Sequence, residues 1–164
     1  VEKLGARISA DYAGEEIILV CILRGAFVFC ADLARCINLP VEIDFISASS
    51  YGNSATTTGN VQIDKDLGMD IEGKNILLVE DIVDTGLTLK MLRDIMLVRK
   101  PKTMKIATLM DKKDRRKADI QPDYCCFCIP DEFVVGYGLD YASRYRNLPD
   151  VMILDESVYS GQGK

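Results

Sequence analysis

The sequence predicts an α/β protein with a doubly wound, mainly parallel sheet flanked by helices. Short apolar runs rich in β-branched residues alternate with amphipathic helical stretches along the 164 residues. With 48% hydrophobic and 27% charged residues, the composition is that of one globular domain. Apolar strands separated by helices are typical of parallel sheets, whose ligands bind at the carboxyl ends of the strands. We therefore expect a single domain over residues 1–164.

The first predicted βα unit lies near the amino end. The continuous apolar run from Ile17 to Leu23 is typical of a strand buried on both faces. Apolar residues then recur at helical spacing from Ala26 to Ile37, and Pro40 ends the pattern. Val41 to Ser47 alternates as a half-exposed strand does, whereas Ser49 to Asn60 is almost free of apolar residues and predicts a mobile loop.

A second unit follows in the middle of the chain. Asn75 to Val79 predicts another central strand, and apolar residues at helical spacing continue from Leu89 until Pro101. Lys105 to Met110 predicts a further strand, and Asp111 to Asp119 a charged connection. Three short strand candidates complete the chain: Tyr124 to Ile129, Phe133 to Gly136, and Val151 to Leu154.

Charge and composition exclude several classes of function. The net charge is −5 and the longest basic block is Arg115-Arg116-Lys117, so we expect no nucleic-acid surface. The chain has no histidine, which excludes Ser-His-Asp and His-metal mechanisms and leaves proton transfer to Asp, Glu, Lys, Tyr or Cys. The longest apolar stretch is far below the roughly 20 residues that span a bilayer, so we expect no membrane association.

The positions of the cysteines indicate in which cellular compartment the protein is found. The six cysteines lie inside apolar runs and lack the paired C-x-x-C spacing of zinc sites. They also lack the loop setting of a disulfide framework. We therefore expect reduced cysteines and a cytoplasmic protein.

One segment carries most of the chemical information: Leu78 to Leu89, LVEDIVDTGLTL. It places Glu80, Asp81 and Asp84 in what we expect to be a single turn between a strand and a helix. Three crowded acids repel one another, which favours a ligand or metal that uses them. Backbone N–H groups at the helix start, with two nearby threonine hydroxyls, predict a phosphate cradle and hence a phosphosugar. The alternative is a solvated acidic turn.

This segment resembles the phosphoribosyl pyrophosphate motif of the purine phosphoribosyltransferases. Segments across nearly the whole chain resemble the bacterial hypoxanthine(-guanine) phosphoribosyltransferases: LRGAF (23–27), SSYGN (49–53), VEDIVDTG (79–86), RKPK (99–102), PDEFVVGYGLDY (130–141) and YRNLP (145–149). The resemblance implies the type I phosphoribosyltransferase fold with a small hood subdomain over the base. Family members begin somewhat earlier than Val1, and the chain lacks an initiator methionine, so we expect a truncated amino end.

The resemblance implies transfer of 5-phosphoribosyl from phosphoribosyl pyrophosphate to hypoxanthine or guanine, giving IMP or GMP plus pyrophosphate. Asp84 matches the catalytic residue that takes the proton from the purine, and Glu80 and Asp81 match the acids that hold the ribose hydroxyls. The residues that match the ribose and 5-phosphate site are Glu80, Asp81, Asp84, Thr85, Gly86, Leu87 and Thr88. Many relatives carry lysine where Leu87 stands, so we expect no side-chain cation there.

The pyrophosphate side is matched by Arg24, Gly25 and Arg146, and the Leu23–Arg24 peptide can be cis in the family. Because the chain is net negative, the charge of pyrophosphate has to be neutralised locally. Mg²⁺ suits this role, since it binds substrate phosphates and keeps several waters. The matching ligands are Glu80, Asp81 and Asp140, partly through substrate and water.

The purine site is matched by four residues. Lys112 corresponds to the lysine that donates to the six-oxo group, Phe133 to the aromatic residue that stacks on the ring, and Val134 to a backbone contact at its far edge. Asp140 corresponds to a residue near both metal and base.

Ser50 and Tyr51 match the family's lid, which closes over the reacting centre and excludes water. The implied partners are phosphoribosyl pyrophosphate, hypoxanthine and guanine, with assembly into a homodimer or homotetramer. One alternative is a nucleotide-sensing, RNA-binding regulator on the same fold, although a basic face should accompany it. Another is a transferase for xanthine, adenine or a pyrimidine; Lys112 favours a six-oxopurine over adenine.

Overall fold

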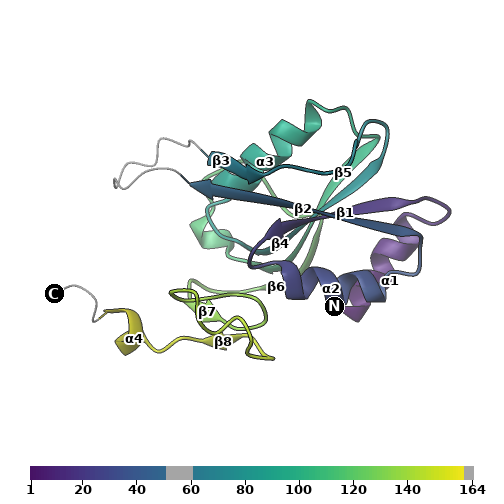
Figure 1. Cartoon of the computed structure of the whole chain (residues 1–164). Helices are drawn as coiled ribbons and strands as arrows, with labels where there is room; N and C mark the ends of the chain where they lie inside the picture. The colour runs from purple at the N-terminus through teal and green to yellow at the C-terminus, as the bar shows by residue number, and fades with distance from the viewer. Residues whose placement is uncertain (51–60, 161–164) are drawn as a thin grey trace.

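The computed structural model describes residues 1–50 and 61–160. Its main sheet has six strands in the order β3-β2-β1-β4-β5-β6, and only β3 runs antiparallel to its neighbour. The strands of this sheet are β1 (Ile17–Leu23), β2 (Val41–Ser50), β3 (Val61–Lys65), β4 (Asn75–Val83), β5 (Thr103–Asp111) and β6 (Tyr124–Cys128). The prediction of a doubly wound, mainly parallel sheet is confirmed (Figure 1).

Helices cover both faces of this sheet (Figure 1). The helices α1 (Glu2–Asp11) and α2 (Phe27–Cys36) share one core with alternate residues of β1, such as Leu19. The helix α3 (Leu87–Leu97) shares the other core with the intervening residues, such as Val20. The strand β1 is thus buried on both faces, as its unbroken apolar run predicts.

Two strands run further than the sequence pattern predicts, because neighbouring strands continue to pair with them. The strand β2 extends to Ser50, and Ser49 pairs with Gln62 of β3, so the expected loop does not begin at Ser49. The strand β4 extends to Val83 through its pairing with β5. Glu80 and Asp81 therefore lie on a strand, and the expectation that they share a turn with Asp84 is wrong.

A second, two-stranded antiparallel sheet forms the hood expected from the resemblance. It consists of β7 (Val134–Val135) and β8 (Met152–Ile153), followed by the short helix α4 (Glu156–Ser160). Both strands lie within predicted strand segments, but they belong to the hood and not to the main sheet (Figure 1). The hood meets the β1–α2 turn so closely that a Cβ on Gly138 would lie 2.3 Å from the carbonyl oxygen of Gly25.

Four elements had no predicted counterpart: α1, β3, the short 3₁₀ helix η1 (Lys113–Arg115) and α4. The helix α1 packs tightly on α2, since a Cβ on Gly5 would lie 2.5 Å from the Cys36 carbonyl oxygen. No helix within residues 1–50 and 61–160 has the length and apolarity needed to cross a membrane. The single-domain organisation and the cytoplasmic location stay predictions.

Candidate active site

The turn between β4 and α3 is built around a glycine. Gly86 has a φ of +76°, a conformation that L side chains rarely adopt, and a Cβ there would lie 2.7 Å from a side-chain methyl of Ile120. Arg116 braces the turn, since its Nε donates to the Asp84 carbonyl oxygen over 3.0 Å. The N-cap residue of α3 is Gly86, which has no side chain to cap the helix, and the Leu87 N–H makes only a long hydrogen bond of 3.5 Å to Thr85 Oγ1. The first N–H groups of α3 are therefore available to an anion.

A cavity of about 250 Å³ opens beside this turn. It is lined by the end of β4 and the start of α3: Glu80, Asp81, Ile82, Val83, Asp84, Thr85, Gly86, Thr88 and Leu89. All but one of the residues matched to ribose and 5-phosphate are among them. The exception is Leu87, whose side chain is exposed and does not line the cavity.

Glu80 and Asp81 are adjacent carboxylates in a confined setting. Burial and the neighbouring Asp81 charge raise the pKa of Glu80 well above its ordinary value, and burial raises the pKa of Asp81 as well. Asp81 Oδ1 accepts a hydrogen bond from the Ile82 N–H over 2.6 Å. A Cβ on Gly25 would lie 1.5 Å from Asp81 Oδ2, so only glycine lets the β1–α2 turn approach this carboxylate. Such a pair favours a ligand that offers hydroxyls or positive charge.

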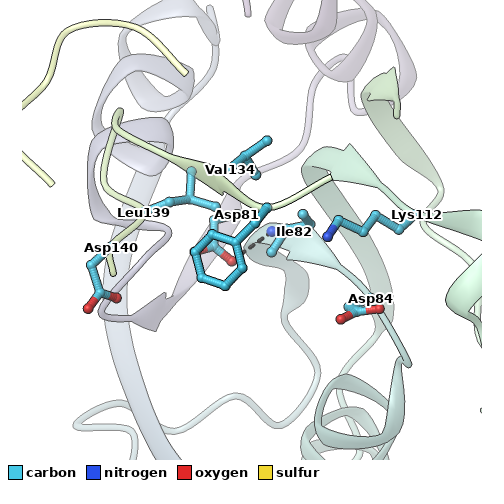
Figure 2. Close-up of a pocket in the computed structure, with 8 residues that line it drawn as sticks. Asp81, Ile82, Asp84, Lys112, Val134, Leu139 and Asp140 are labelled. Atoms are coloured by element: carbon cyan, nitrogen blue, oxygen red, sulfur yellow. Dashed lines mark hydrogen bonds between the residues drawn. The ribbon is translucent and has the colours of Figure 1, made fainter. Parts of the chain in front are cut away.

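A second cavity, of about 240 Å³, adjoins the first and shares Asp81, Ile82 and Asp84 with it. Its remaining lining comes from the end of β5 and from the hood: Lys112, Phe133, Val134, Leu139 and Asp140. All four residues matched to the purine therefore line one cavity. In Figure 2, Lys112 and Asp84 lie on one side of it and Asp140 on the other.

The contacts of Lys112 and Phe133 fit a base site. The Lys112 side chain is buried, and its Nζ lies 3.4 Å from Asp131 Oδ1. The Phe133 ring meets Tyr141 edge-on with a centroid distance of 5.6 Å and stacks on Tyr159 at 5.1 Å. Neither tyrosine lines the cavity, so both support the phenyl ring from outside it.

The residues matched to pyrophosphate line neither cavity but lie beside them. Gly25 abuts Asp81, and the Leu23–Arg24 peptide is cis, as the resemblance allows. Arg24 is exposed in the same turn. Arg146 Nη2 lies 2.6 Å from Asp140 Oδ1, and the positive charge of Arg146 also lowers the pKa of Asp81, opposing the effect of burial.

The carboxylates matched to Mg²⁺ supply the oxygen donors that this ion prefers. They do not form a closed cage: in the part of the chain that the structure describes, the single group of three Asp, Glu, Cys or His side chains with ligand atoms all within 4.8 Å is Asp111, Cys125 and Cys128. Two adjacent acids with raised pKa values and a third on the hood fit an ion held partly through substrate and water.

One ion-pair bridge across the site was not predicted. Arg115 Nε lies 2.9 Å from Asp84 Oδ1, and Arg115 Nη1 lies 3.1 Å from Asp131 Oδ2. Lys112 also faces Asp131, and the two cations hold the pKa of Asp131 below its ordinary value. The sequence displays Arg115 only as part of a basic run. Its partners are far away along the chain, so no local pattern identifies the bridge.

The predicted lid is not placed by the structure. Tyr51 lies outside the described residues, and for Ser50 only the backbone at the end of β2 is described. The role of Ser50 and Tyr51 as a lid stays a prediction.

Residues 1–142 match the model of the phosphoribosyl transferase domain, and the chain belongs to this family. The hypoxanthine phosphoribosyltransferase of Salmonella typhimurium is 51% identical over 161 residues, covering 95% of this chain and 90% of the relative. The hypoxanthine-guanine phosphoribosyltransferase of Streptococcus agalactiae is 50% identical over 159 residues, or 97% and 88% of the two chains.

A crystal structure of a hypoxanthine phosphoribosyltransferase from Staphylococcus aureus superimposes with a TM-score of 0.93 at 48% identity. The match covers 96% of this chain and 86% of that one. Within the family, the relatives are therefore hypoxanthine and hypoxanthine-guanine phosphoribosyltransferases. The resemblance, the type I fold and the enzyme class are confirmed.

Proposed function

We propose that this enzyme transfers the 5-phosphoribosyl group of phosphoribosyl pyrophosphate to hypoxanthine or guanine, yielding IMP or GMP plus pyrophosphate, as a step of purine salvage. The observation that carries the proposal is the pair of adjoining cavities that share Asp81, Ile82 and Asp84. One is bounded by an uncapped helix start suited to a phosphate, and the other by a lysine and an aromatic ring suited to a base. The shared residues lie where sugar and base would meet.

In this reaction the bond from the anomeric carbon to pyrophosphate breaks and a bond to the purine imidazole nitrogen forms. The Asp84 carboxylate takes the proton from that nitrogen. Positive charge develops on the sugar as the bond breaks, and the carboxylates of Glu80 and Asp81 lie on the ribose side to stabilise it, as carboxylates do in glycosidases. Arg24, Gly25 and Arg146 bind the departing pyrophosphate.

Lys112 selects the base. Its ammonium donates to the six-oxo group of the purine, Phe133 stacks on the ring, and the backbone of Val134 contacts the far edge. When Mg²⁺ is bound, held by Glu80, Asp81 and Asp140 together with substrate and water, it neutralises the charge of the pyrophosphate group. The enzyme acts as a homodimer or homotetramer in the cytoplasm.

The direct test is a product assay. The purified chain is mixed with Mg²⁺, phosphoribosyl pyrophosphate and, in separate reactions, hypoxanthine, guanine, xanthine or adenine, and nucleotide and pyrophosphate are separated by chromatography. Equal amounts of nucleotide and pyrophosphate should form with hypoxanthine or guanine. Asp119→Asn, which changes an exposed carboxylate outside both cavities, serves as the control and should keep full activity. Nucleotide formation from xanthine alone would overturn the substrate assignment, and no nucleotide from any base would overturn the reaction.

A further inference from the structure

A cluster of metal-ligating side chains lies outside both cavities, at the edge of the main sheet. Asp111 is the last residue of β5 and pairs in register with Cys128, the last residue of β6. Cys125 lies on the same edge strand. The carboxylate of Asp111 and the two thiols come within 4.8 Å of one another. None of the three residues lines either cavity of the candidate active site.

The donor set is that of a soft divalent cation. Contrary to the expectation from the sequence, Cys125 and Cys128 have the C-x-x-C spacing that is typical of paired thiolate ligands at zinc sites, and their sulfur atoms lie within 4.8 Å of each other. A carboxylate oxygen is an accepted third ligand of Zn²⁺, and a water completes the tetrahedron. Mg²⁺ prefers an all-oxygen shell, so two sulfurs among three ligands discriminate against it.

The charges around the cluster also suit a bound cation. Arg116 donates to Asp111 Oδ1, and its guanidinium is held in place by the Asp84 carbonyl oxygen. With two thiolates, one carboxylate, a divalent ion and this guanidinium, the complete site is electrically neutral. Second-sphere groups that hold a ligand in this way are common at metal sites.

The exposure of the ligands provides an entry path. Asp111 is buried, Cys125 is half-buried and Cys128 is exposed on the edge strand, so an ion can reach the cluster from solvent. Because the ligands are thiolates, binding of the metal displaces the thiol protons into solvent.

We propose that Asp111, Cys125 and Cys128 form a binding site for one thiophilic divalent cation of the Zn²⁺ class, with water as the fourth ligand. The site is separate from the one proposed for Mg²⁺ and does not depend on the proposed reaction. Because Lys112 follows Asp111 directly, an ion there would also hold the end of β5 next to the base cavity.

The test uses Co²⁺ as a spectroscopic probe on the reduced full chain. Thiol titration first verifies that all six cysteines are free. Addition of Co²⁺ should then produce thiolate-to-cobalt charge-transfer absorption that saturates at one equivalent. Zn²⁺ should abolish this absorption, a large excess of Mg²⁺ should leave it unchanged, and Zn²⁺ should raise the melting temperature.

Three variants separate the cluster from other cysteines and from the active site. Cys125→Ser and Cys128→Ser should each remove most of the charge-transfer absorption. Cys126→Ser, which changes a neighbouring cysteine of the same strand outside the cluster, should retain it, and so should Asp140→Asn at the candidate active site. Absence of the absorption in the fully reduced wild-type chain would overturn the proposal. The proposal would also be overturned if Cys126→Ser lost the charge-transfer absorption to the same extent, or if Cys128→Ser retained it.

Discussion

At the scale of single residues, Asp84 is the group on which proton transfer depends. Its carboxylate lines both cavities and lies within 2.9 Å of Arg115 Nε. We expect Asp84→Asn to lower kcat by about 10²–10⁴-fold, because a general base is lost while its shape and its acceptor oxygen remain. Binding of phosphoribosyl pyrophosphate, measured by calorimetry, should be spared. Asp114→Asn, at an exposed neighbour of Lys113, is the control; an unchanged kcat in Asp84→Asn would exclude the role.

Glu80 illustrates the cost in stability of a functional carboxylate. Because its pKa is raised in the folded state, protonated Glu80 stabilises the fold, and this contribution is lost as the pH rises from the ordinary value of 4.5 through the folded pKa. Glu80→Gln removes the charge at every pH while keeping the shape. The variant should therefore have a higher Tm than wild type at neutral pH, with a difference that shrinks toward pH 4.5.

Scanning calorimetry across this pH range measures the effect on Glu80→Gln. The control is Glu42→Gln, an exposed glutamate on β2. Activity of Glu80→Gln should fall, because ribose positioning is impaired. A Tm difference that is independent of pH would show that the Glu80 charge is not what destabilises the native state.

Lys112 determines which bases are accepted, because an ammonium donates hydrogen bonds and accepts none. Adenine presents an amino group to it, and leaving such a buried donor unpaired costs about 1–3 kcal/mol or more. Adenine should be a very poor substrate, with a kcat/KM far below those of hypoxanthine and guanine. Lys112→Gln should narrow this difference in kcat/KM, mainly by lowering the values for hypoxanthine and guanine. Values of kcat/KM for the three bases in wild type, Lys112→Gln and the exposed neighbour control Lys113→Gln provide the measurement. An unaltered preference in Lys112→Gln would remove this residue from the base site.

At the scale of elements, the short helix α4 supports the base cavity through one side chain. Tyr159 stacks on Phe133 with an interplanar angle of 27° but does not line the cavity. An aromatic pair contributes about 0.5–1.5 kcal/mol, so Tyr159→Leu should raise the KM for the purine about 2- to 10-fold. The affinity for phosphoribosyl pyrophosphate should not change. Tyr159→Phe keeps the ring and should behave as wild type; a KM equal to wild type in Tyr159→Leu would show that Phe133 needs no such support.

At the scale of the whole molecule, the charge of −5 and a pI near 4.8 oppose binding to polyanions other than the substrate. We expect no saturable binding of RNA at physiological salt, with or without IMP, in a filter-binding assay. A nucleotide-sensing RNA regulator would behave differently, since IMP would change its RNA affinity. Salt-dependent RNA binding that responds to IMP would favour that alternative function.

The sequence by itself determined the features that depend on neighbours along the chain. The unbroken apolar run of β1 predicts burial on two faces, and Gly86 in the motif fits a turn that no other residue adopts without strain. The motif from Leu78 to Leu89 likewise predicted which residues would surround one cavity. These signals are local because backbone conformation and periodicity are set within a few residues.

Only the tertiary structure decided the features that join distant segments. Pairing with β5 carries β4 past Val79 and places Glu80 and Asp81 on a strand, which no local pattern encodes. The Arg115 bridge between Asp84 and Asp131 joins a short 3₁₀ helix, a turn and the hood. The expectation that the cysteines lack the spacing of zinc sites is wrong for Cys125 and Cys128 of β6, and Asp111 adds a third donor through the register of two parallel strands. Long-range contacts depend on how the strands align, and that alignment is settled by burial across the whole sheet and not by any one segment.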